Sequence, residues 1–361
     1  MPGSSPTGGF YYADYLKLPE LLSAQAPESV RHGRPAHDEM LFIIVHQTYE
    51  LWFKQILHEL DRIQADFAGD VVEDEYLGRI VHGLDRINEI LKLLIQQLEV
   101  LETMTPLDFL DFRDFLFPAS GFQSVQFRLI EIRLGLARDA RSTYAGKPFD
   151  ETLAEPDKSR VAIAERGHKL IEQLDGWLSR TPFVHRPDYD FSLEYRNAVK
   201  RMLEDDAARV RAHAAMSAEQ REAEAGRIEA SLAEFQAIFA PASGASPWRM
   251  SRAAMQAALF ITVYRDRPVL QQPFRLLAAL MNVDELLTLW RYRHALMVQR
   301  MIGVKIGTGG SAGHDYLRET AAKHRIFSDL FRLSTYLIPR SRLPRLPREL
   351  EDAMGYRYSA R

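Results

Sequence analysis

Two histidines of the sequence lie within apolar runs, where an imidazole could bind a metal ion or hydrogen-bond a ligand. His46 occurs in LFIIVHQTYELWF, one helical turn after Phe42, and His294 occurs in WRYRHALMV, one turn after Trp290. A single histidine in such a run is most often a buried residue hydrogen-bonded to a neighbour. Each position therefore keeps two interpretations, a structural histidine and a functional one that faces a pocket.

Taken together, His46 and His294 would suit a haem site. They lie in separate predicted helices, and the chain contains no cysteine, so a thiolate-ligated iron is excluded. Haem iron can take one axial imidazole and leave its other face open beneath a second polar group. The spacing of the two histidines permits this arrangement without requiring it.

Arg113 is a candidate for binding a substrate carboxylate. In LDFLDFRDFLFPASGF, Phe109 precedes it by one helical turn and Leu116 follows about one turn later. Such an arginine either pairs with a neighbouring aspartate at the surface or holds a carboxylate through two parallel hydrogen bonds, with Phe109 packing on an aromatic ring. The sequence leaves both interpretations open.

Other kinds of catalytic site find little support. Without cysteine, a metal would need His, Asp, Glu or Tyr ligands, and a dinuclear carboxylate site would need two Glu-x-x-His pairs, of which only Glu165 with His168 occurs. Zinc-protease, P-loop and nucleophile-elbow motifs are missing. GTGGSAG at 307–313 follows a predicted helix rather than a strand, so its glycines are better interpreted as allowing close approach of backbone to a ligand.

The composition is typical of a soluble globular protein, since 46% of the 361 residues are hydrophobic and 26% are charged. A net charge of −3, from 46 basic and 49 acidic residues, argues against a general nucleic-acid-binding role. The segment MPGSSPTGGF lacks the features of a signal peptide, and no segment is long and apolar enough to span a membrane. We therefore expect a cytoplasmic protein without nucleic-acid or membrane partners.

Hydrophobic periodicity predicts an all-α protein, because apolar residues recur at three- and four-residue spacings and alternating strand patterns are absent. Long helices are expected over 37–67 and 74–104, and a further helical block starts at Met255 and ends in the glycine-rich loop. PASG, at 118–121, is expected to be a turn between two helical pieces.

The chain is expected to form one main domain with two end segments. Residues 1–9 are rich in Gly, Ser and Pro and are predicted to be mobile, and residues 10–340 form a single all-α domain. Within it, residues 140–250 have helical periodicity but no recognisable motif. Residues 341–361 form a C-terminal tail, and the Pro-rich sequence LIPRSRLPRLPREL predicts an extended conformation there.

Several long stretches resemble the tryptophan 2,3-dioxygenase family. They are YYADYLKL, HDEMLFIIVHQTYELWFKQILHELD, FRDFLFPASGFQSVQFR, DELLTLWRYRHALMVQRMIGVKIGTGGSAG and LFRLSTYLIPR, which cover roughly residues 10–130 and 255–340. The resemblance implies a helical-bundle haem protein of the tryptophan/indoleamine dioxygenase type, containing haem b. It implies an enzyme that converts L-tryptophan and O2 to N-formylkynurenine, the first step of tryptophan degradation by the kynurenine pathway.

The resemblance also implies roles for individual residues. His294 corresponds to the axial ligand of the haem iron, and His46 to the distal histidine that hydrogen-bonds the indole N–H. Phe42 and Phe109 correspond to residues that line the indole pocket. Arg113 corresponds to the arginine that binds the substrate carboxylate.

Further matching positions extend the implied site to a loop and to a second subunit. Thr308, in the glycine-rich loop, corresponds to the residue that contacts the amino and carboxylate groups. The remaining pocket and haem-edge positions are matched by Leu116, Ser120 and Gly121. Tyr12 and Tyr15 correspond to tyrosines that reach into a neighbouring subunit's site. This implies a homotetramer in which the N-terminal segment completes a neighbouring site.

One departure bears on substrate choice. The family loop usually reads GTGGSSG, and here Ala312 replaces the second serine. A relative that keeps the pocket but inserts one oxygen atom into a substituted tryptophan, in secondary metabolism, is therefore the alternative enzyme. A haem-binding sensor is a third hypothesis, but a sensor would need the iron ligand without the amino-acid clamp formed by Arg113 and Thr308.

Overall fold

The computed structural model describes residues 11–69, 71–138, 140–141, 143–144, 147–148, 153–239, 248–303 and 324–356. Across these ranges the chain consists of α-helices and short 3-10 turns, apart from two small antiparallel ladders. One ladder pairs β1 (Thr143–Tyr144) with β2 (Lys147–Pro148), and the other pairs β3 (His185–Arg186) with β4 (Tyr189–Asp190). The expected all-α class is confirmed.

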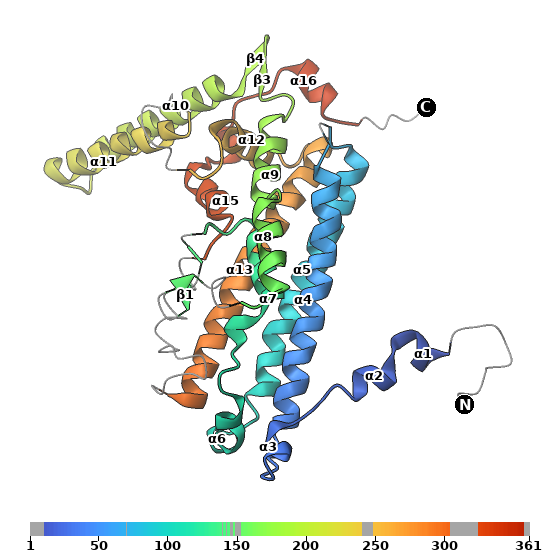
Figure 1. Cartoon of the computed structure of the whole chain (residues 1–361). Coiled ribbons are helices and arrows are strands. Elements are labelled where there is room, and N and C mark those ends of the chain that lie inside the picture. The colour runs from blue at the N-terminus through green and yellow to red at the C-terminus, as the bar shows by residue number, and fades with distance from the viewer. Residues whose placement is uncertain are drawn as a thin grey trace.

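Three long helices form the body of the protein: α4 (Glu39–Phe67), α5 (Asp74–Leu101) and α13 (Pro268–Ile302). They run side by side along its length, and both α4 and α13 pack against α5 (Figure 1). The helices predicted over 37–67 and 74–104 are confirmed to within three residues at each end. The two histidines therefore belong to two helices that share one neighbour.

The central helix α5 owes its position to a regular apolar stripe. Leu77, Leu84, Leu91 and Leu98 recur every seven residues, and all four are buried. Residues spaced by seven lie on one face of a helix, so this face can pack continuously between its neighbours. Each buried leucine side chain contributes about 2 kcal/mol through removal of apolar surface from water.

A compact turn connects α5 with the next helical layer. It contains α6 (Pro106–Arg113), the 3-10 turns η1 (Asp114–Leu116) and η2 (Gly121–Gln123), and then α7 (Val125–Leu134). α6 begins with a capping box in which the Thr105 hydroxyl accepts from Asp108 N and the Asp108 carboxylate accepts from Thr105 N. The prediction that PASG separates two helical pieces is confirmed.

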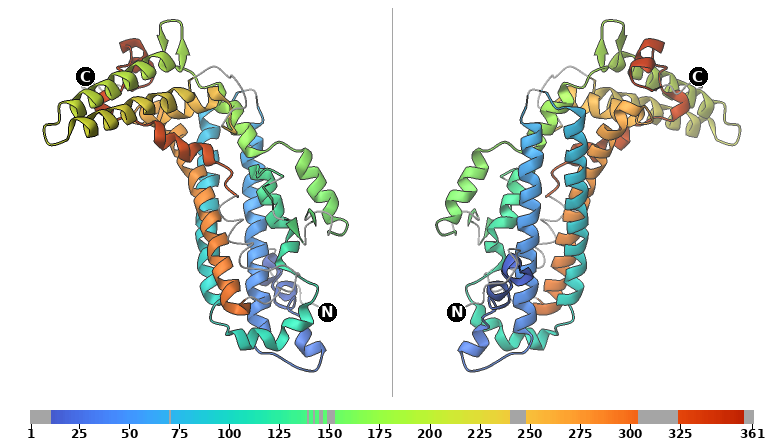
Figure 2. Two further views of the ribbon diagram at one scale, coloured as in Figure 1. Left: turned by 90° about the vertical axis from the view of Figure 1, so that its left-hand side faces the viewer. Right: turned by 90° about the vertical axis from the view of Figure 1, so that its right-hand side faces the viewer.

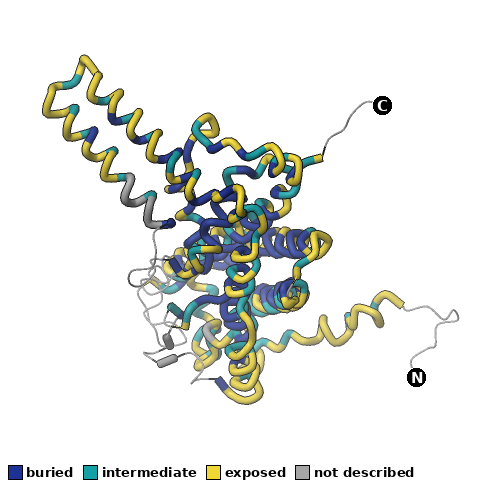
Figure 3. Tube along the Cα trace, turned by 90° about the horizontal axis from the view of Figure 1, so that it is seen from above, coloured by how far each residue is buried: buried dark blue, intermediate teal, exposed yellow. Residues whose placement is uncertain are grey.

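The middle of the chain contributes α8 (Asp157–Arg166), α9 (Leu170–Ser179), α10 (Phe191–Arg211), α11 (Ala218–Ala237) and α12 (Arg252–Val263). α10 and α11 pair as a hairpin that projects from the body (Figure 2). Exposed residues follow most of the hairpin, whereas buried residues gather where the long helices meet (Figure 3). The ladders β1–β2 and β3–β4 lie in the same region as these five helices.

The C-terminal part returns to the body through α15 (Ser328–Arg332), η4 (Leu333–Tyr336), η5 (Arg340–Arg342) and α16 (Arg348–Ala353). The prediction of an extended tail is wrong for α16. Leu346, Leu350 and Met354 are spaced by four and are buried, so this short segment gains more from packing a helical face than from staying extended. Proline at position 347 does not prevent this, because it precedes the first helical residue.

The N-terminal helices α1 (Tyr12–Leu16) and α2 (Leu18–Leu22) extend away from the body, and α3 (Glu28–Arg31) lies beside the start of α4 (Figure 1). The buried Glu39 carboxylate joins α3 to α4 by accepting hydrogen bonds from the N–H groups of Glu28 and Ser29. The predicted mobile segment 1–9 lies outside the described residues.

Candidate active site

His46, on α4, carries its ring proton on a defined nitrogen. Its Nδ1 lies 2.7 Å from the carbonyl oxygen of Phe42. A carbonyl oxygen can only accept, so Nδ1 donates, and Nε2 is left as an acceptor in the neutral ring. Desolvation lowers the pKa of His46, although the Phe42 hydrogen bond and the Glu50 carboxylate act in the opposite direction. The ring is therefore neutral at pH 7.

The surroundings of His46 differ from those of a packed core histidine. Protein atoms are close enough to desolvate the ring, yet the residue still has exposed surface. The ring is thus enclosed by neighbouring elements while part of it stays open. An acceptor nitrogen in such a place can bind the N–H of a small ligand.

His294, on α13, is the second histidine of this site. Its ring stacks on Trp290, with 5.3 Å between ring centroids and 6° between the ring planes. Desolvation, followed by the charge of His46, lowers the pKa of His294 to about 4. Within the described ranges, neither ring nitrogen has a hydrogen-bond partner. A neutral imidazole without a competing partner has the form that a metal ion requires.

The neutral imidazole of His294 is a kind of ligand that a haem iron takes. Among the described residues, no cluster of three or more His, Asp or Glu side chains could hold a metal ion. A porphyrin supplies most of the ligands of a haem iron, so a single protein imidazole fits that group. His46 is the second polar group of this site, and its proximity contributes to the lowered pKa of His294.

Aromatic rings adjoin His46 and form one wall of the site. The Phe42 ring centroid lies 4.1 Å from that of His46 and 5.7 Å from that of Phe109. Phe112 is fully buried behind them, at 5.6 Å from Phe42 and 5.4 Å from Phe109. Three mutually packed rings are well suited to hold a flat aromatic ligand beside the imidazole. The predicted pair Phe42 and Phe109 is thus brought together with His46.

Arg113 ends α6, directly after the aromatic residues of that helix. Its side chain is half-buried, and Leu116 packs against the main core from the following turn η1. The neighbouring Asp108 carboxylate is engaged in the capping box with Thr105. Ser120 and Gly121 lie next along the chain, at the start of η2.

The two remaining parts of the predicted site are the glycine-rich loop and the N-terminal tyrosines. Thr308 and the whole glycine-rich loop, including Ala312, lie outside the described residues. Tyr12 and Tyr15 lie on α1, where they are about 70% exposed, on the arm that extends from the body.

One residue of the site, Phe112, was missed in the sequence, and it supports the aromatic wall. Trp290, which stacks on His294, and Glu50, one turn after His46, were recognisable from the sequence as helical neighbours of the two histidines. Helical spacing could have indicated Phe112 too, because it lies three residues from Phe109. Spacing alone gives no indication of which of the many such neighbours touch.

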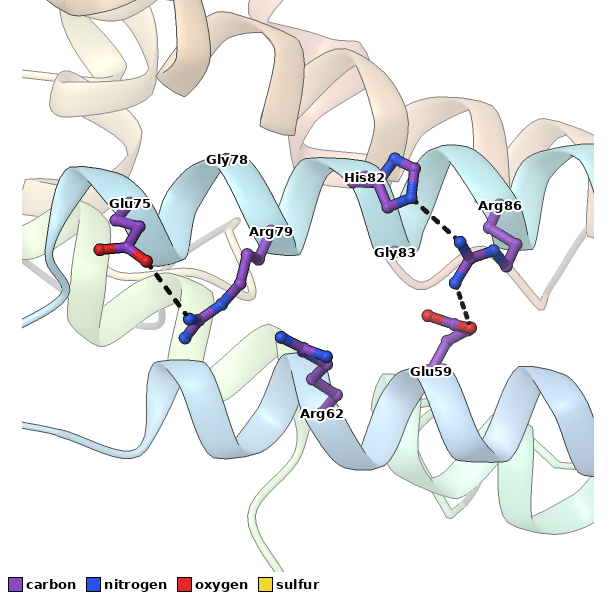
Figure 4. A pocket seen from close by; sticks show the side chains of 8 residues that line it. All are labelled: Glu59, Arg62, Glu75, Gly78, Arg79, His82, Gly83 and Arg86. Carbon is purple, nitrogen blue, oxygen red and sulfur yellow. Dashed lines mark hydrogen bonds and ion pairs between the residues drawn. The ribbon is translucent and has the colours of Figure 1, made fainter.

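A separate groove of about 450 Å³ lies between α4 and α5 (Figure 4). Arg86 donates there to Glu59 Oε1 at 2.7 Å and to His82 Nε2 at 3.0 Å. Glu59 follows His46 by thirteen residues on α4, a distance of about 20 Å along the helix axis. The groove is therefore distinct from the histidine site.

The fold and the site define a class: an all-α protein with two neutral histidines on separate helices and an aromatic wall beside one of them. A model of the family described as tryptophan 2,3-dioxygenase matches residues 3–337. The chain belongs to the tryptophan 2,3-dioxygenase family. No helix within the described ranges has the length and apolar character needed to cross a membrane.

Curated relatives named tryptophan 2,3-dioxygenase support this membership over nearly the whole chain. The protein from Bdellovibrio bacteriovorus is 48% identical over 353 residues, 96% of this chain and 98% of its own length. The protein from Alteromonas mediterranea is 45% identical over 351 residues, which cover 96% of this chain and 97% of the relative. The protein from Dictyostelium discoideum is 44% identical over 357 residues, which cover 97% of this chain and 89% of the relative.

Proposed function

We propose that this protein is a haem-dependent dioxygenase that converts L-tryptophan and O2 to N-formylkynurenine. Membership of the tryptophan 2,3-dioxygenase family supports the reaction class. The observation that carries the proposal is the pair of histidines: His46 keeps Nε2 as an acceptor beside the Phe42 ring, and His294 presents a neutral imidazole stacked on Trp290. This reaction would be the first step of tryptophan degradation by the kynurenine pathway, carried out in the cytoplasm.

His294 would hold the iron of haem b as its axial ligand. Its lowered pKa and the absence of a hydrogen-bond partner among described residues support this role. When bound, the haem would supply the iron centre at which O2 reacts with the substrate. Trp290, stacked on the His294 ring, would keep the imidazole plane in one orientation.

His46 would orient the substrate. With Nδ1 donating to Phe42, its Nε2 can accept a hydrogen bond from the indole N–H of tryptophan. Phe42 and Phe109 would pack on the indole ring, and this contact would hold it in one plane beside the imidazole. These residues would position the indole ring, and no proton transfer by His46 is required for that.

Arg113 and Thr308 would recognise the amino-acid part of the substrate. Arg113 follows the aromatic wall on the same helix, so a carboxylate bound by it would extend from an indole held by Phe109. Leu116, Ser120 and Gly121 continue from Arg113 through η1 and η2 and would form the next pocket and haem-edge contacts. A substrate without the carboxylate would lose the hydrogen bonds that Arg113 would give to it.

Tyr12 and Tyr15 would complete the site of a neighbouring subunit in a homotetramer. Their exposure of about 70% on the projecting α1 supports a role outside this chain's own body. Sedimentation of the purified protein measures the oligomeric state. If the N-terminal segment of each subunit completes a neighbouring site, removal of residues 1–16 should impair turnover more than haem content.

Product mass tests the proposed reaction. Haem-loaded protein is reduced without oxygen, L-tryptophan and air are added, and the product is analysed. Tryptophan with two added oxygen atoms and an opened ring would establish the dioxygenase. One added oxygen and an intact ring, formed only from a substituted tryptophan, would instead establish the alternative monooxygenase, which the named relatives favour less.

A further inference from the structure

Glu50 forms a close set of hydrogen bonds between α4 and the N-terminus of α7. Its Oε1 accepts from the Ser124 hydroxyl at 2.6 Å, and its Oε2 accepts from Gln126 Nε2 at 2.8 Å. The same Gln126 amide also donates to the backbone oxygen of Glu50 at 2.8 Å. Both carboxylate oxygens are therefore used, and hydrogen bonds to a charged acceptor are stronger than neutral ones.

The Ser124 hydroxyl has two functions at this point. It donates to Glu50 and also accepts from the backbone N–H of Phe127 at 3.3 Å, which caps α7. The preceding turn is closed by its own hydrogen bonds, from Gln123 N to Ser120 O and from Ser124 N to Gly121 O. A displacement of Ser124 would thus move the turn that carries Ser120 and Gly121.

Aromatic contacts also link the first turn of α7 to His294. The Phe127 ring centroid lies 5.0 Å from that of Trp290, and Trp290 stacks on His294. Glu50 itself lies one turn after His46 on α4. The hydrogen bonds of Glu50 therefore hold α7 between the helix that carries His46 and the aromatic support of His294.

We propose that Glu50 is a positioning residue that sets the Ser120–Gly121 turn and Phe127 relative to His46, and thereby shapes the substrate pocket. The inference rests on the proposed function and deepens it. Glu50 need not touch the substrate, because its effect passes through Ser124 and Gln126. A small displacement of the pocket wall is enough to weaken binding strongly.

Glu50→Ala removes both carboxylate acceptors, and Glu50→Gln keeps one oxygen for the Ser124 hydroxyl. In haem-loaded protein, the alanine variant should raise KM for L-tryptophan about tenfold and change kcat by less than about threefold. The glutamine variant should recover most of the loss. Ser124→Ala should also raise KM, and combining it with Glu50→Ala should add little, because both remove one shared interaction.

Gln64 provides a matched control on the same helix pair. It lies on α4 and donates to the backbone oxygen of Arg133 at 3.3 Å, at the opposite end of α7. It also donates to His168 O at 2.8 Å. Gln64→Ala therefore removes comparable hydrogen bonds from the same helix without affecting the pocket end, and it should leave KM unchanged.

Two readouts do not depend on turnover. Amide hydrogen exchange in the haem-free protein should become faster at Gln123, Ser124 and Phe127 in Glu50→Ala, and the paramagnetic resonance spectrum of the ferric haem should change through Phe127 and Trp290. A haem-loaded Glu50→Ala protein with wild-type KM, or with wild-type exchange at these amides, would overturn the inference. If the wild-type protein had no activity on tryptophan, the proposed function would be refuted instead. The role of Glu50 would then be decided by the amide hydrogen exchange and the paramagnetic resonance spectrum of the Glu50→Ala variant.

Discussion

Substitution of Glu131, whose carboxylate is buried, tests how ion pairs stabilise charged side chains in the interior of this protein. Its Oε2 accepts from Arg128 at 2.8 Å and its Oε1 accepts from Arg291 at 2.8 Å, and all three side chains are buried. Burial alone would raise the pKa of Glu131, but the charges of Arg128 and Arg291 outweigh it and lower the pKa to about 2. Removing the carboxylate takes away the negative charge that the two buried guanidinium groups share.

Glu131→Gln should lower the free energy of unfolding by about 3 kcal/mol at neutral pH. Removal of one partner from a buried ion pair costs roughly 3–5 kcal/mol. The difference between the ordinary pKa of 4.5 and a folded-state pKa of about 2 corresponds to about 3 kcal/mol as well. A loss of this size should lower Tm by roughly 4 °C.

Urea unfolding followed by circular dichroism measures this effect. Because the pKa of Glu131 is lower in the folded than in the unfolded state, its contribution is fully present above about pH 4.5 and decreases as the pH falls towards 2. The difference between wild type and Glu131→Gln should therefore narrow as the pH falls below about 4.5. Asp157→Asn, which breaks an exposed pair with Arg160, is the control and should cost less than about 1 kcal/mol. A Glu131→Gln protein as stable as that control would refute the reasoning about uncompensated buried charge.

Three further substitutions and one pH dependence test the site. His294→Ala should lose haem, seen as loss of the Soret band, and full haem occupancy would disprove the ligand assignment. His46→Ala should keep haem but weaken tryptophan binding about tenfold, measured as Kd by spectral titration, and a parallel loss of haem would contradict a purely distal role. Arg113→Ala should raise KM for tryptophan at least about tenfold while affecting tryptamine little, and equal effects on both would exclude a carboxylate clamp. Desolvation lowers the pKa of His46, so KM for tryptophan should stay constant near neutral pH and rise only in acid, when Nε2 becomes protonated. A KM that falls in acid would contradict this.

Local sequence patterns predicted most of the helices. The leucines of α5 recur every seven residues, and Thr105 with Asp108 forms the capping box that begins α6. Such features depend on residues close in sequence, so their physical effect can be worked out without knowing the rest of the fold. The exception is α16, because proline-rich composition predicts an extended chain and the burial of Leu350 against the body was not visible locally.

The candidate site was only partly predictable for the same reason. The resemblance to the family implied a pocket around His46, Phe42 and Phe109, and their rings do lie together. The sequence did not indicate that Phe112 lies behind them, nor that His46 donates from Nδ1 and keeps Nε2 as acceptor. Which neighbours touch depends on rotamers and on the packing of α6 against α4, which spacing does not determine.

By itself, the sequence determined the helical class, the positions of the long helices and the residue types available for chemistry, because these follow from composition and short-range periodicity. Only the tertiary structure decided which residues act on one another. Glu50 bonds Ser124 across 74 positions, and Glu131 pairs with Arg291 across 160. Such contacts arise from the way α4, α7 and α13 pack, and each is selected by the energy of the whole arrangement rather than by any local stretch of sequence.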